Sequence, residues 1–118
     1  MRVLVLGASL KAERYSNMAV KLLLAHQLDV FAVGNQDGQI DGVKIHRNKP
    51  LIDQIDTITL YLNAQHQKEY YNYILDLKPR RVIFNPGAEN EELVKLLNEN
   101  NILSEEACTL VLLRTGQF

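Results

Sequence analysis

The stretch Met1–Ser16, MRVLVLGASLKAERYS, decides the fold of this chain. Four apolar residues at positions 3–6 run directly into Gly7-Ala8-Ser9, a polar loop follows, and an amphipathic segment begins at Tyr15. A short apolar strand that turns at a glycine and continues as a helix is typical of α/β domains whose first turn holds a phosphate group. The first amides of such a helix lack partners and carry partial positive charge, so we expect peptide nitrogens beyond Gly7 to converge on a diphosphate.

The rest of the sequence alternates between strand and helix patterns. Helices are predicted at Tyr15–His26, Gln65–Leu77 and Glu89–Asn100. Strands are predicted at Val3–Leu6, Val30–Val33, Val43–Ile45, Thr57–Leu62 and Arg81–Phe84, with a last strand from Ile102-Leu103 and Ala107–Leu113. This alternation predicts one Rossmann-like α/β domain over residues 1–118, a doubly wound and mostly parallel sheet of about five to six strands with helices on both faces.

Three connecting segments carry no strong strand or helix pattern of their own. Gln36–Gly42 reads as a polar loop because it holds the turn dipeptides Asp37-Gly38 and Asp41-Gly42. Pro50 suits the first turn of a short helix. The tail, residues 114–118, is expected to fray.

Composition excludes several classes of partner. The chain has 118 residues, of which 47% are hydrophobic and 23% charged, and this balance is ordinary for a soluble globular protein. The net charge of -1 gives no field that would attract nucleic acid or an anionic membrane, and no apolar run is long enough to span a bilayer. The single cysteine, Cys108, cannot form an internal disulfide, which favours a reducing, cytoplasmic setting.

The first turn is the main candidate site for a small nucleotide ligand. Its candidate binding residues are Gly7, Ala8, Ser9, Lys11, Arg14 and Ser16. The two cations could neutralise phosphate charge, or they could be solvated loop charges. Ser16 could cap the helix from Asn17 onward or donate to a phosphate. The turn lacks the second and third glycines of a dinucleotide fingerprint, so a plain strand-to-helix turn stays open as an interpretation.

The end of the second strand argues against NAD. A carboxylate there normally binds the adenosine ribose, whereas this strand ends in Gly34-Asn35, which would let the chain pass close under an adenosine group. The nearest acid, Asp37, reads as a turn residue. After the third strand, Arg47 and Lys49 could meet an additional phosphate or could be solvated.

No set of residues indicates catalysis or a metal site. The histidines His26, His46 and His66 lack metal-like spacing, and Glu91-Glu92 suits the positive start of a helix. Cys108, at the start of the last predicted strand, reads as a buried inert thiol, with a reactive thiol near the ligand as the alternative. Three further cations, Lys78, Arg80 and Arg81, read as solubility charges.

Together these stretches resemble a known family, the small stand-alone CoA-binding proteins, which are related to the CoA-binding domain of the succinyl-CoA synthetase α subunit. The matching stretches, in order, are VLVLGAS with RYSN, VFAVGN, DGVKIHRNKPLID, FNPGAENEEL and EEACT. The resemblance implies a Rossmann-like fold and coenzyme A as the ligand. It also implies that Gly7, Ala8, Ser9 and Ser16 surround the CoA diphosphate and that Gly34 and Asn35 border the adenosine.

The sequence departs from the family pattern at two places. Gln36 stands where the family has a proline, and Tyr61-Leu62-Asn63 stands where it often has a ligand-facing arginine. The phosphate would then depend more on Lys11, Arg14 and backbone amides. The first turn with its cations, together with the resemblance, makes a CoA or acyl-CoA binding module without catalytic machinery the leading hypothesis. The alternatives are a small NAD(P)-binding redox or sensor protein and an interaction domain with a vestigial nucleotide pocket.

Overall fold

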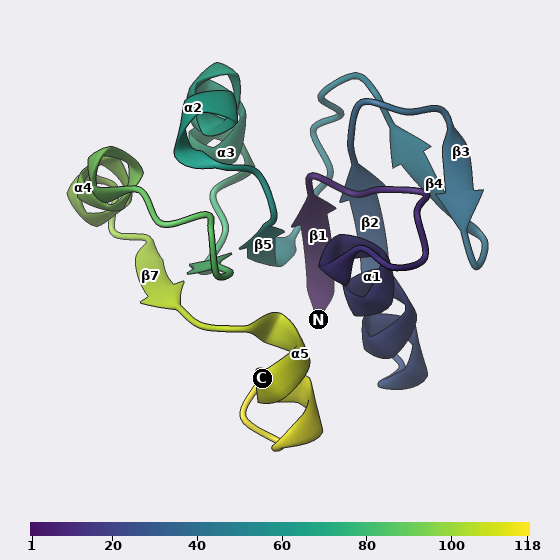
Figure 1. Cartoon of the computed structure of the whole chain (residues 1–118). Helices are drawn as coiled ribbons and strands as arrows, with labels where there is room; N and C mark the ends of the chain where they lie inside the picture. The colour runs from purple at the N-terminus through teal and green to yellow at the C-terminus, as the bar shows by residue number, and fades with distance from the viewer.

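The computed structural model describes residues 1–118 and contains a seven-stranded sheet in the order β3-β4-β2-β1-β5-β6-β7 (Figure 1). The strands are β1 (Arg2–Leu6), β2 (Asp29–Val33), β3 (Gly38–Ile40), β4 (Val43–His46), β5 (Ile55–Leu60), β6 (Arg81–Phe84) and β7 (Leu103–Glu106). The helices are α1 (Tyr15–Ala25), α2 (Ala64–Gln67), the 3-10 turn η1 (Lys68–Tyr70), α3 (Tyr71–Leu77), α4 (Glu91–Glu99) and α5 (Thr109–Arg114). All strand pairs are parallel except β3 with β4, so the α/β Rossmann-like class is confirmed.

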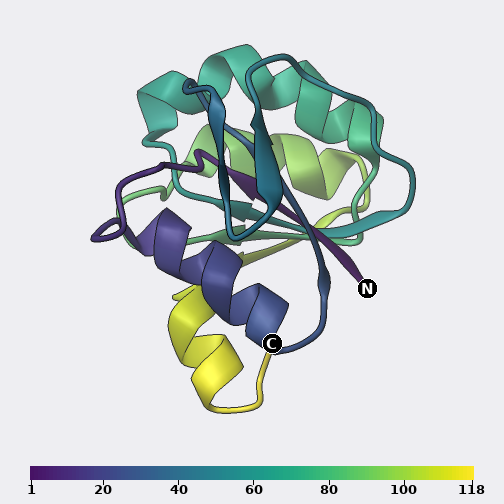
Figure 2. The same cartoon turned by 90° about the vertical axis from the view of Figure 1, so that its right-hand side faces the viewer.

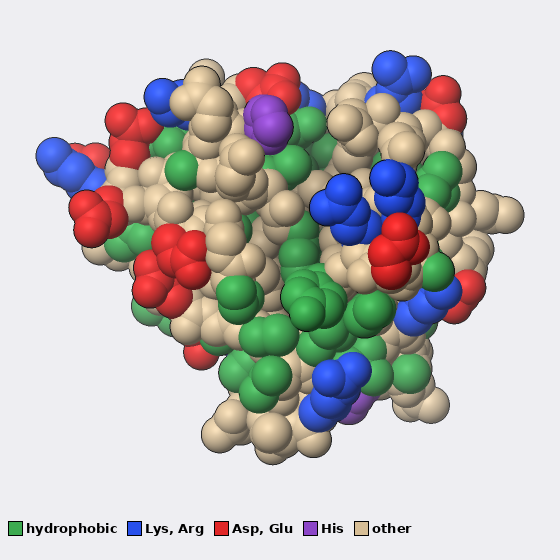
Figure 3. Space-filling model, in the orientation of Figure 1, with side chains coloured by type: hydrophobic (Ala, Val, Ile, Leu, Met, Phe, Trp, Pro, Cys, Tyr) green, Lys and Arg blue, Asp and Glu red, His purple; other side chains and the backbone are tan.

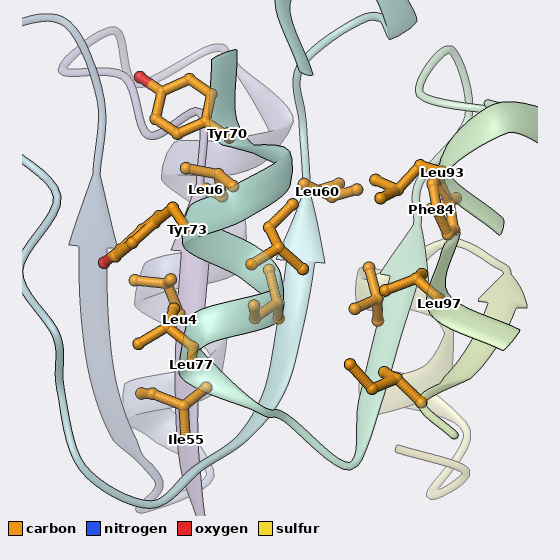
Figure 4. Close-up of a cluster of buried hydrophobic side chains, with 14 of the residues drawn as sticks. Leu4, Leu6, Ile55, Leu60, Tyr70, Tyr73, Leu77, Phe84, Leu93 and Leu97 are labelled. Atoms are coloured by element: carbon orange, nitrogen blue, oxygen red, sulfur yellow. The ribbon is translucent and has the colours of Figure 1, made fainter. Parts of the chain in front are cut away.

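The molecule has three layers, with α2, α3 and α4 on one face of the sheet and α1 and α5 on the other (Figure 2). Under the first group, Leu4, Leu60 and Phe84 from the sheet meet Tyr73 and side chains of α4 in the larger hydrophobic core (Figure 4). The second core lies between the sheet and α1. Because central strands are buried on both faces, β1 is apolar throughout, as its sequence predicts.

The sheet has more strands than expected because the predicted polar loop at Gln36–Gly42 contains β3. This strand pairs antiparallel with β4 through a tight hairpin at Asp41-Gly42, where both residues have positive φ, 47° and 88°. Turns of that kind match the twist of paired strands. Ile40 anchors the strand because it is buried in the second core. The expectation of a loop here was wrong.

The last predicted strand was right only in part: β7 begins at Leu103 but ends at Glu106, and α5 replaces most of Ala107–Leu113. A short apolar run does not distinguish a buried strand from a buried helix. Here the amide of Thr109 donates to Asn85 Oδ1 at 2.8 Å, which fixes the helix start beside β6. Cys108 is consequently the residue before the helix and is half-buried, rather than a buried residue in a strand.

Two other connecting segments differ from expectation. No helix follows Pro50; residues 49–52 are irregular, and the Tyr73 hydroxyl donates to the Pro50 carbonyl at 2.7 Å. The tail is not frayed at its last residue, because the Arg81 guanidinium lies 4.7 Å from the centre of the Phe118 ring. No helix combines the length and the apolar character that a membrane crossing requires.

Candidate ligand-binding cleft

A cleft of about 730 Å³ opens at the carboxyl ends of β1, β2, β5 and β6. Ligands of open α/β sheets bind at this edge, and the volume is within the range of small-molecule sites. Eight of the nine predicted site residues line it: Gly7, Ala8, Ser9, Lys11, Arg14, Ser16, Gly34 and Asn35. These eight predicted binding residues therefore lie around a single cleft.

The backbone amides of the first turn are largely used within the protein. The amides of Gly7 and Ala8 both donate to the Val33 carbonyl, at 2.8 and 3.0 Å. The amide of Leu10 donates to Gln36 Oε1, and that of Lys11 donates to Ser9 Oγ. These bonds join the β1–α1 loop to the end of β2. Among residues 7–11, only the amide of Ser9 has no acceptor within the protein.

The start of α1 supplies further free amides. Its first helical hydrogen bond runs from the Met18 amide to the Arg14 carbonyl at 3.1 Å, so the amides of residues 15–17 have no acceptor within the helix. No side chain caps this start. Ser16 is inside the first turn instead of preceding it, so its predicted capping role was wrong. An uncapped helix start beside a cleft is a suitable site for an anion.

Close contacts between loops explain the two glycines that line the cleft. Gly7 has a φ of +99°, and a Cβ there would lie 3.1 Å from both the Tyr61 carbonyl carbon and Leu62 Cγ. A Cβ at Gly34 would overlap the carbonyl oxygen of Ala8. The loops after β1, β2 and β5 therefore meet at distances that only glycine permits.

The cleft has two chemically different halves. One half is formed by the β1–α1 loop and carries the cations Lys11 and Arg14; in Figure 3 blue side chains gather on that side of the central hollow. The other half comes from the segments after β5 and β6 and has aromatic and apolar lining, including Tyr61, Leu62 and Pro86. Burial raises the pKa of Tyr61 to about 12, so its ring carries a neutral hydroxyl.

The structure places Arg47 outside this cleft. It lines a separate, shallower hollow of about 500 Å³ together with Lys44 and His46. Arg47 Nη1 lies 3.4 Å from Asp37 Oδ2, and both side chains are well exposed. An ion pair of this kind contributes little to stability, so the guanidinium can exchange its partner at small cost.

Sequence reasoning missed the lining of the second half. Tyr61 and Leu62 follow β5, His66 is in α2, and Pro86 follows β6. Glu69 and Tyr70 are in η1, and Glu69 is the one carboxylate of this half. The available signal was positional, because segments that leave the carboxyl ends of parallel strands gather at one edge. This rule indicates which segments border the cleft, but it does not tell which of their side chains line it.

A mostly parallel Rossmann-like sheet with a cleft at its carboxyl edge, beside an uncapped helix start, defines an α/β ligand-binding domain. The model of one such family, the CoA binding domain, matches residues 1–114. The chain therefore belongs to the CoA-binding domain family, as the sequence resemblance predicted. No curated protein matches the sequence.

Several solved structures are similar to this chain. An uncharacterized protein with a crystal structure has 47% sequence identity and a TM-score of 0.97, with 99% of this chain and 97% of that chain covered. A conserved hypothetical protein from Pyrococcus furiosus has 24% identity and a TM-score of 0.82, covering 93% and 97%. The dinucleotide-forming acetyl-coenzyme A synthetase 1 of Ca. Korarchaeum cryptofilum, solved with phosphate and ADP, has 15% identity and a TM-score of 0.72, with 87% of this chain and 25% of that chain covered. The last two show a shared fold.

Proposed function

We propose that this protein binds CoA or acyl-CoA as a non-catalytic module, with the diphosphate held at the start of α1. The observation that carries the proposal is the coincidence of an uncapped helix start with Lys11 and Arg14 in one cleft of a CoA-binding-domain chain. The helix amides supply hydrogen bonds and partial positive charge, and the two cations supply full charge. Ser9 and Ser16 add hydroxyl groups beside them.

The two ends of CoA then fall on different surfaces. The adenosine borders Gly34 and Asn35, where the chain passes without a side chain at position 34. The pantetheine arm runs toward Tyr61, Leu62 and Pro86. This direction is supported by the chemistry of that half, which has no Lys or Arg in its lining and offers apolar surface to an uncharged chain.

Removing either cation is expected to weaken CoA binding roughly tenfold, because one charge-assisted hydrogen bond contributes ~1.5–3 kcal/mol. Lys11→Ala and Arg14→Ala should each show this loss in isothermal titration calorimetry with CoA. Lys21→Ala is the matched control, since Lys21 is an exposed cation of α1 outside the cleft. Equal affinities for wild type and both cleft variants would remove these side chains from the binding site.

Arg47 is proposed to meet the additional phosphate on the ribose of CoA. The proposal is supported by the cationic and imidazole side chains that surround it, Lys44 and His46. Arg47→Ala should weaken CoA binding about fivefold, a modest loss because the side chain is exposed. The same variant should bind dephospho-CoA, which lacks that phosphate, as wild type does. An equal loss for both ligands would contradict the assignment.

A further inference from the structure

Gln67 is a polar side chain of α2 with no exposed surface. Its Nε2 donates to the Leu62 carbonyl at 2.8 Å and to the Ala88 carbonyl at 2.7 Å. Its Oε1 accepts from Asn90 Nδ2 at 2.8 Å. Both amide hydrogens are therefore used, and each goes to the backbone of a different loop. A buried amide with these partners is costly to replace by an apolar group.

The two loops that Gln67 joins form part of the wall of the second, mainly aromatic and apolar half of the cleft. Leu62 lines the cleft after β5, and Ala88 follows the lining residue Pro86 after β6. The Gln67 side chain itself does not line the cleft. Its bonds fix the distance between two segments that do.

Asn90 keeps the Gln67 amide in this orientation. Its Nδ2 donates to Gln67 Oε1, and its Oδ1 accepts from the amides of Glu92 and Leu93, capping α4. Because Asn90 Nδ2 is a donor, the atom of Gln67 that faces it must be the oxygen. The nitrogen of Gln67 must then face the two carbonyls. The orientation of Gln67 is thus determined by a helix cap on the opposite side.

We infer that Gln67 is a positioning residue that sets the spacing of the Leu62 and Pro86 segments around the pantetheine arm of the ligand. This inference rests on the proposed function, since it assumes CoA in this cleft. It assigns Gln67 an effect on one part of the ligand only. The diphosphate and adenosine contact loops that Gln67 does not touch.

The test compares CoA with adenosine 3′-phosphate 5′-diphosphate, which is CoA without its pantetheine arm. Gln67→Met should weaken CoA binding roughly tenfold while the fragment keeps its affinity within about twofold. Gln65→Met is the matched control, because Gln65 is an exposed glutamine of the same helix. A merely structural role would lower the melting temperature and weaken both ligands together, or neither, and that result would overturn the inference.

A second variant applies if Gln67→Met does not fold. In Gln67→Glu the introduced carboxyl can accept from Asn90 but, when ionised, cannot donate to the two carbonyls. Burial raises the pKa of such a carboxyl, and its protonated form donates again to one of them. The ratio of CoA to fragment affinity should therefore recover toward the wild-type ratio as pH falls. If Gln67→Glu has the wild-type ratio at every pH, the inference about Gln67 is overturned. If the wild-type protein binds neither ligand, the proposed function itself is overturned.

Discussion

Gly34→Ala should disrupt the cleft more than alanine at any other glycine of this chain. The new Cβ would overlap the carbonyl oxygen of Ala8, so the end of β2 and the first turn cannot both keep their positions. The turn is further held by two amides that donate to the Val33 carbonyl, directly before Gly34. We expect a loss of about 2–3 kcal/mol in the free energy of unfolding, the usual cost of overpacking a tight contact.

The same displacement should weaken CoA binding roughly 10- to 100-fold, because the loop that carries Ser9 and Lys11 would move away from the start of α1. Urea unfolding and calorimetry measure the two effects separately. Gly42→Ala is the control: unlike Gly34, Gly42 has a positive φ of +88°, which favours glycine, but no atom lies within 4 Å of its would-be Cβ. That variant should cost about 1 kcal/mol and leave binding unchanged. Normal CoA affinity in Gly34→Ala would show that the contact between the two loops does not shape the site.

The first half of the cleft follows from local sequence, whereas the second half does not. Val3–Leu6 followed by Gly7 specifies a strand, a turn and a helix within one continuous stretch, so Ser9, Lys11 and Arg14 are placed by their neighbours in the chain. Tyr61 and Pro86 lie in one cleft because β5 and β6 are adjacent in the sheet. Strand order is a tertiary property, which periodicity does not encode.

Hydrogen-bond use is a second property that the sequence does not reveal. Gly7 and Ala8 have amides of the type that holds phosphate, yet the Val33 carbonyl takes both of them. Which amides remain free depends on how closely β2 approaches β1, and on the absence of a side chain at Gly34. The motif therefore predicted the edge of the sheet where the cleft lies, but it could not tell which backbone amides of the first turn remain free.

Arg81 shows that the sequence also does not reveal which charged side chains stabilise the fold. Its position at the start of β6 reads as a solubility charge, but the side chain is only 10% exposed. Its guanidinium donates to Thr57 Oγ1 at 3.2 Å, to Glu105 Oε1 at 3.4 Å and to the Phe118 carbonyl at 3.1 Å. Phe118 is 37 residues away in the sequence, so no local pattern indicates that it covers this arginine. The prediction for Arg81 was therefore wrong.

Arg81→Ala is expected to lower the free energy of unfolding by about 3 kcal/mol, because it removes a largely buried guanidinium that donates to the buried Thr57 hydroxyl and covers the Phe118 ring. The neighbouring Arg80→Ala is the matched control. Arg80 bonds Asp56 through two nitrogens at 3.0 and 3.1 Å, but its side chain is 51% exposed, so its loss should cost less than about 1 kcal/mol. Urea unfolding of the two variants at neutral pH measures the contrast, and equal costs would contradict it.

The free energies of unfolding of the Arg80 and Arg81 variants should also differ in their pH dependence. The Arg80 hydrogen bonds hold the pKa of Asp56 below its ordinary value of 3.8. A carboxyl with a lowered pKa stabilises the fold at pH values above 3.8 and loses that contribution as the pH falls through the lowered value. The small difference between wild type and Arg80→Ala should therefore vanish in acid. Most of the Arg81 difference should persist there, because the Thr57 hydroxyl, the Phe118 carbonyl and the Phe118 ring do not titrate in that range.

CoA affinity of Arg81→Ala should match wild type, because Arg81 lies at the amino end of its strand, opposite the edge that carries the cleft.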